Sequence, residues 1–123
     1  MELVKIGRLF KTLLLSNEEV QDKIEDRVFP LVAVEGTKFP FLVYRRYAYR
    51  PTNNKDFEDE IISLEIAILS PKYEESVDVT DAVINAVNRK KTEEIENIKI
   101  MGSSEEFSGD TYIQKLQIDI YLK

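Results

Sequence analysis

Alternating apolar and polar positions mark two strands. In the segment Glu58 to Leu69, isoleucine or leucine occupies every second position from Ile62 to Ile68, and polar or small residues lie between them. The C-terminal segment Thr111 to Leu122 repeats the alternation. A two-residue repeat is typical of a strand with one buried face. Because a parallel strand buried on both faces would be apolar throughout, the two strands are predicted to share an antiparallel sheet that helices cover on one side.

Three other segments have apolar residues three or four positions apart, which is the spacing of one helix face. They are Glu2 to Leu15, Asn17 to Ile24, and Tyr73 to Arg89. In the third segment, acidic residues lie near the start and basic residues near the end, and this distribution complements the helix dipole. The sequence therefore predicts three helices.

The remaining elements are weaker. Asp26 to Pro30 is predicted to be an edge strand or a loop, because Pro30 has no backbone donor. Asn97 to Met101 is predicted to be a short strand. Four segments have turn composition: Glu35 to Lys38, Pro51 to Asp56, Gly102 to Glu106, and Ser108 to Asp110. Together the elements predict an α+β fold in one domain, residues 1–123, with an antiparallel or mixed sheet of about four strands and helices on one face.

The segment Phe41 to Tyr49 has a strand pattern in which neither face is purely apolar, because aromatic residues and arginines alternate along both faces. Tyrosine and arginine are enriched at the centres of protein interfaces. We therefore predict a subunit or partner interface on this strand and the following turn, formed by Arg45, Tyr47, Tyr49 and Arg50. The same cluster could stack on exposed nucleic-acid bases, but 23 acidic against 17 basic residues disfavour binding to a phosphate backbone.

Candidate catalytic chemistry is restricted by composition. The chain has neither His nor Cys, which excludes a thiolate or imidazole metal site and a Ser-His-Asp relay. Its densest carboxylate group is Asp56, Glu58, Asp59 and Glu60. Along an extended chain these side chains point to opposite sides, so they do not converge as a metal-dependent nuclease requires. The prediction is a protein that is not an enzyme and that has no catalytic residue, metal or cofactor.

The sequence contains neither a signal-peptide pattern nor a hydrophobic stretch long enough to span a membrane. Without cysteines there is also no evidence of disulfides that would indicate a secreted protein. We therefore expect folding inside the cell and no membrane partner.

The order of the elements resembles that of the tail-completion, or tail-terminator, proteins of long-tailed bacteriophages and prophages. The resemblance covers nearly the whole chain: an N-terminal helix, the segment Arg27 to Pro30, a glycine turn, the segment Phe39 to Tyr44, a long hairpin, a strand followed by Ser70-Pro71 and a helix, and a final strand from Asp110. Four positions match the family pattern, with structural roles: Arg27, Pro30, Pro40 and Tyr44.

The resemblance implies a protein that caps the head-proximal end of the tail tube as a ring, commonly hexameric, ends tube polymerisation and forms the surface that joins the head. Its partners would be further copies of itself, the tail tube protein and the head-tail connector protein, and the only nucleic acid would be DNA passing through the ring. It would be found in the virion tail and, during assembly, in the cytoplasm of the host bacterium. The alternatives are a head-tail connector or other minor tail protein, and a small nucleic-acid-binding α+β module.

Overall fold

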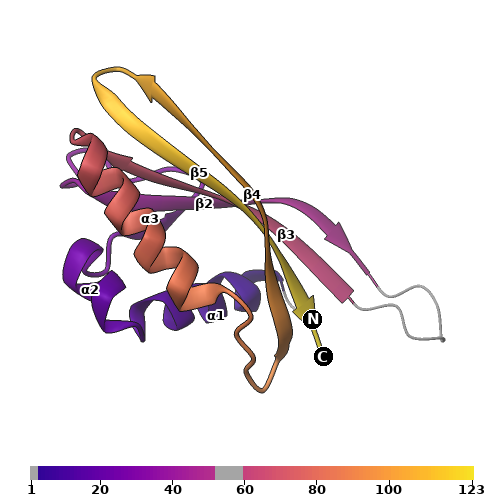
Figure 1. Ribbon diagram of the computed structural model, residues 1–123. Helices are drawn as coiled ribbons and strands as arrows, with labels where there is room; N and C mark the ends of the chain where they lie inside the picture. The colour runs from indigo at the N-terminus through magenta and orange to yellow at the C-terminus, as the bar shows by residue number, and fades with distance from the viewer. Residues whose placement is uncertain (1–2, 52–59) are drawn as a thin grey trace.

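A five-stranded sheet and three helices make up the computed structural model, which describes residues 3–51 and 60–123 (Figure 1). The elements follow in the order α1 (Leu3–Leu15), α2 (Glu18–Ile24), β1 (Val28–Pro30), β2 (Phe41–Arg50), β3 (Glu60–Ser70), α3 (Tyr73–Val87), β4 (Ile95–Ser108) and β5 (Thr111–Leu122). The strand order is β1-β2-β3-β5-β4, and only β1 and β2 are parallel. The fold is α+β, and the sheet is mixed with one strand more than the sequence predicted.

The two strands predicted from alternation are neighbours in the middle of the sheet. Ile62 lies opposite Ile120, Leu64 opposite Ile118, and Ile66 opposite Leu116. All six of these side chains are buried, and they belong to the same core cluster as the buried residues of the three helices. The prediction that the two strands share an antiparallel sheet with one covered face is confirmed.

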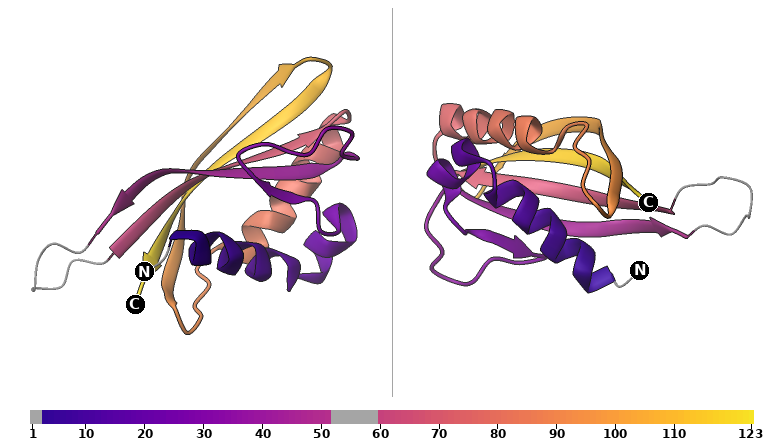
Figure 2. Two further views of the ribbon diagram at one scale, coloured as in Figure 1. Left: turned by 180° about the vertical axis from the view of Figure 1, so that it is seen from behind. Right: turned by 90° about the horizontal axis from the view of Figure 1, so that it is seen from below.

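The helices lie on one face of the sheet, as the views in Figure 2 show. Helix α1 buries Ile6, Phe10 and Leu14, which are spaced four residues apart and so lie on one stripe. Helix α2 begins after Asn17, whose side-chain oxygen accepts a hydrogen bond from the backbone N–H of Val20 at 3.0 Å. Val20 and Ile24 then join the same core. Among the described residues, no helix is long and apolar enough to cross a bilayer.

Strand β4 differs most from the sequence prediction. It runs through 14 residues, and the segment Gly102 to Glu106, predicted to be a turn, lies inside it. The strand continues because β5 provides a partner along its whole length, from Ile95 opposite Leu122 to Ser108 opposite Thr111. The chain reverses at Gly109 and Asp110, which both have positive φ angles of 56° and 58°, as a two-residue hairpin of type I′ requires.

The predicted helix Tyr73 to Arg89 also ends earlier than expected, at Val87. Asn88 is extended and Arg89 has a φ of 59°, so the chain leaves the helix here. The basic residues expected at the helix end therefore lie in the connection to β4. Of the other predicted elements, the hairpin tip after Pro51 and the first two residues of the strand that was predicted from Glu58 fall outside the described residues.

Candidate functional site

The sheet face opposite the helices carries pairs of charged side chains from neighbouring strands. Arg45 on β2 pairs with Glu65 on β3 at 3.3 Å, and Lys115 on β5 pairs with Glu106 on β4 at 3.0 Å. These positions lie on the outer face because side chains alternate along a strand, and the adjacent residues Leu64 and Leu116 point into the core. The outer face therefore carries one ion pair between β2 and β3 and another between β4 and β5.

Asp119 is the one buried carboxylate among the described residues. The hydroxyl of Ser63 donates a hydrogen bond to it at 2.6 Å, and Arg50 lies 3.4 Å from its other oxygen. Ser63 is on β3, next to β5, and Arg50 is on β2, one strand further away, so the group ties β2, β3 and β5 together. Arg50 is therefore engaged by a carboxylate of its own chain.

A β-bulge separates the four predicted interface residues. The register of β2 against β3 shifts between Arg46 and Ala48, which leaves Tyr47 without a cross-strand partner. The strict alternation predicted for this segment is therefore wrong beyond Arg46, since an inserted residue reverses which face the following side chains occupy. Arg45 and Arg50 lie on the outer face, whereas Tyr49 lies opposite buried Ile62.

Tyr47 and Tyr49 consequently have different surroundings. Tyr47 is 43% exposed, and the guanidinium of Arg45 lies 5.9 Å from its ring centroid. Tyr49 packs against the core, and its hydroxyl donates to Glu60 at 2.7 Å, a hydrogen bond that is the main cause of its raised pKa. The interface prediction for Arg45, Tyr47, Tyr49 and Arg50 stays a prediction, and the four side chains do not share one surface.

The positions that match the family pattern lie where β1, β2 and α2 meet. Arg27 donates from Nε to the carbonyl of Pro40 at 3.0 Å and from Nη2 to the carbonyl of Lys23 at 3.3 Å. Pro40 is buried and follows a cis peptide bond, and Pro30 is the exposed last residue of β1. These contacts join the end of α2 to the start of β2.

Tyr44 connects the sheet to α1. Its ring packs edge-on against Phe10, with 5.3 Å between the centroids. A Cβ at Gly7 would lie 2.8 Å from the Tyr44 hydroxyl, so glycine leaves the room that this ring needs. Burial disfavours the phenolate and raises the pKa of Tyr44 above its ordinary value of 10.0.

Stability is expected to fall in strongly alkaline solution. Because the folded chain favours the neutral form of Tyr44, the resulting stabilisation is complete below the unfolded pKa of 10.0 and is lost as the pH rises through the higher folded-state pKa. Urea unfolding measured from about pH 9 to about pH 11 should show this loss, and Tyr44→Phe should reduce it. Tyr47→Phe, at an exposed position on the same strand, is the control. An identical alkaline decline in Tyr44→Phe and the unmodified protein would contradict the assignment to Tyr44.

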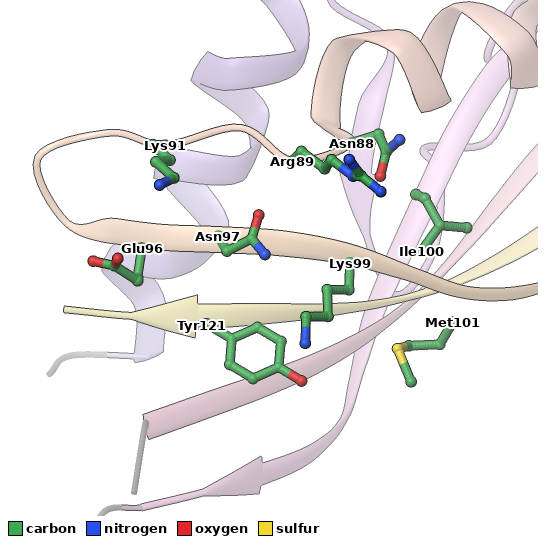
Figure 3. Close-up of a pocket in the computed structure, with 9 residues that line it drawn as sticks. All are labelled: Asn88, Arg89, Lys91, Glu96, Asn97, Lys99, Ile100, Met101 and Tyr121. Carbon is green, nitrogen blue, oxygen red and sulfur yellow. The ribbon is translucent and has the colours of Figure 1, made fainter. Parts of the chain in front are cut away.

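An open hollow of about 700 Å³ lies beside β4 and the end of α3 (Figure 3). Its lining includes the cations Arg89, Lys91 and Lys99, with Glu96 as the acidic member. Lys99 lies over the ring of Tyr121, 4.8 Å from its centroid, on the other side of the β4 ribbon from Arg89. The charged groups are thus spread around a strand and do not converge on one point.

The predicted carboxylate group is only partly within the described residues. Asp56, Glu58 and Asp59 lie outside them, and Glu60 begins β3 and accepts the hydrogen bond from Tyr49. Across residues 3–51 and 60–123, no three His, Cys, Asp or Glu side chains are arranged to hold a metal ion. Of the predicted carboxylate group, the structure therefore describes only Glu60, and its side chain accepts a hydrogen bond from Tyr49.

Two surface features were missed by the sequence analysis. One is the exposed end of the β4–β5 hairpin, which carries Phe107, and the other is a groove between α1 and β2. The hairpin could have been found from the Gly109-Asp110 turn by extending both strands away from it. The groove has no local signal, because α1 and β2 are far apart in the sequence.

Comparison with known proteins gives a clear likeness in structure. No protein-family model and no curated protein sequence matches this chain. A solved chain described as "Virion of native gene transfer agent (GTA) particle" has a TM-score of 0.80 with this structure and is 8% identical in sequence. The match covers 95% of this chain and 93% of the other chain. The two proteins share a fold over nearly their whole lengths.

Proposed function

We propose that this protein is a structural component of a phage or prophage tail, which caps the head-proximal end of the tail tube as a ring. The observation that carries the proposal is the shared fold with a chain of a gene transfer agent virion, at a TM-score of 0.80 and over 95% of the chain. The element order that resembles tail-completion proteins supports it independently, since that resemblance rests on the sequence alone.

In this role the protein ends tail polymerisation and forms the surface for head-tail joining. The partners are further copies of the chain, in a ring of about six, the tail tube protein and the head-tail connector protein. The protein acts in the virion tail after assembly in the bacterial cytoplasm, and it has no catalytic role. The alternative is a function as head-tail connector or as another minor tail protein. Such a protein would have the same fold but would bind a different partner in the particle.

The nucleic-acid-binding alternative has less support. Within the described residues, Arg45 and Arg50 of the basic and aromatic cluster pair with Glu65 and Asp119. A guanidinium that is already bound to a carboxylate is less available to a phosphate. The net charge of −6 also opposes binding to a phosphate backbone.

Sedimentation velocity and negative-stain microscopy of the purified chain test the proposal. Six copies carry 6 × −6 = −36 formal charges. We expect monomers in dilute solution at low salt, and rings with a central opening as protein concentration and ionic strength rise, because salt screens repulsion beyond about 10 Å. Rings that bind the ends of tail tubes would support the cap, and rings that bind only the connector would support the alternative. A chain that stays monomeric under all conditions and does not bind tail tubes would contradict the proposal of a tail-capping ring.

A further inference from the structure

A groove with an apolar floor and a basic rim lies between α1 and the edge of the sheet at β1 and β2. It has a volume of about 680 Å³. Buried Ile6, Ile62 and Leu64 contribute to its lining, together with Val4 and Leu31, which are 67% and 70% exposed. We call this feature the basic groove, because its charged lining residues are all cations: Arg8, Lys11, Arg45 and Arg46. The guanidinium of Arg45 pairs with Glu65 on the outer face, so Arg8, Lys11 and Arg46 supply the positive charge of the groove.

The exposed end of the β4–β5 hairpin has the complementary chemistry. We call residues 103–110 the hairpin tip; all eight are exposed. The tip contains three acidic residues and no basic residue: Glu105, Glu106 and Asp110. It also presents Phe107, which is 58% exposed and lies 4.8 Å from the ring of Tyr112, between ring centroids. Glu106 already pairs with Lys115 of the same chain at 3.0 Å. An exposed aromatic side chain on an acidic tip is suited to an apolar groove with a cationic rim.

The tip is held in place by its neighbours. The carboxylate of Glu105 accepts hydrogen bonds from the Tyr73 hydroxyl at 3.3 Å and from the Gln114 amide at 2.8 Å. The ring of Tyr73 also packs edge-on against Tyr112, with centroids 5.4 Å apart. Since a preformed patch loses less conformational entropy on binding, these contacts favour docking.

The groove and the tip lie on opposite edges of the sheet. The groove is lined from β1, β2 and β3, and the tip belongs to β5 and β4, at the other end of the strand order (Figure 1). A surface and its complement on different sides of one subunit form a head-to-tail contact, which gives a closed ring when the rotation between copies closes. Two different patches are what a ring needs.

We infer that the hairpin tip of one copy docks in the basic groove of the next copy, with Phe107 as the apolar anchor. This inference rests on the proposed ring and names the two surfaces that build it. Six such contacts would place the acidic tip of each copy against Arg8, Lys11 and Arg46 of its neighbour. That local attraction would oppose the repulsion between subunits of the same net charge.

Point variants in the full-length chain test the contact. Phe107→Ala and Arg46→Glu should each weaken self-association about tenfold or more in sedimentation velocity, because an anchor and a rim charge are removed. Met101→Ala, at a side chain 54% exposed on the same strand, and Lys90→Glu, outside the groove, are the matched controls. Lys90→Glu adds the same charge as Arg46→Glu, so it separates a local contact from general repulsion. The combined variant Arg46→Glu with Glu106→Arg should regain part of the affinity.

Disulfide cross-linking is a second measurement, and it can detect the contact even when assembly is weak. The chain has no cysteine, so single-cysteine variants have no background reactivity. Ser108→Cys at the tip, mixed with Val4→Cys at the groove on a chain carrying a larger tag, should form a mixed disulfide under mild oxidation. The mixture of Ser108→Cys with Lys90→Cys should not. Rings that form normally with Phe107→Ala and Arg46→Glu, and that give no tip-to-groove disulfide, would overturn this contact and leave the ring intact. A protein that forms no ring at all would overturn the proposed function itself.

Discussion

Replacing Phe10 by alanine is expected to lower the free energy of unfolding by about 3–5 kcal/mol, the usual range for deleting a buried phenylalanine ring. Phe10 has no exposed surface, lies between Ile6 and Leu14 on the buried stripe of α1, and contacts the ring of Tyr44. Its removal leaves a cavity between helix and sheet. In a domain of ordinary stability, about 5–15 kcal/mol, this is a large fraction of the total.

Urea denaturation at a protein concentration that keeps the chain monomeric measures this effect. Phe107→Ala is the matched control, since it deletes the same ring at a position 58% exposed. It should cost about 0.5–1.5 kcal/mol, mainly through the lost contact with Tyr112. Equal losses in the two variants would show that α1 is not docked on the sheet in solution.

Arg27→Met should destabilise the chain by about 2–3 kcal/mol, within the range for hydrogen bonds that involve a charged group. The Arg27 side chain is 16% exposed and donates to two backbone carbonyls, those of Pro40 and Lys23. Methionine keeps most of the apolar stem but leaves both carbonyls without this donor. Arg27→Lys should recover less than half of the loss, because a single ammonium group does not reproduce the fork of a guanidinium.

The ion pair of Arg27 with Glu25 provides the control for that experiment. Glu25 lies 3.2 Å from Arg27 Nη1, but its side chain is 73% exposed. Exposed ion pairs contribute little, so Glu25→Gln should change stability by no more than about 1 kcal/mol in urea unfolding. If Glu25→Gln instead lost as much as Arg27→Met, the ion pair and not the two carbonyl contacts would be what stabilises this junction.

Local patterns were sufficient where one buried face dominates. The alternation from Ile62 to Ile68 predicted β3 and which of its faces is buried. If the strand were turned over, its isoleucine and leucine side chains would be exposed to water. The spacing of Ile6, Phe10 and Leu14 likewise predicted the buried stripe of α1. The sequence by itself thus determined the fold class, the three helices and the covered face of the sheet.

Only the tertiary structure decided features that depend on a distant partner. Gly102 to Glu106 has turn composition, yet it forms part of β4 because β5 offers paired backbone groups, and unpaired ones are unfavourable. The bulge at Tyr47 turned Tyr49 toward the core, which no local pattern indicates. The basic groove combines α1 with β2 and β3, and the hairpin tip exists only because β4 is long. Both candidate contact surfaces were therefore set by non-local pairing and packing, which a short window of sequence does not contain.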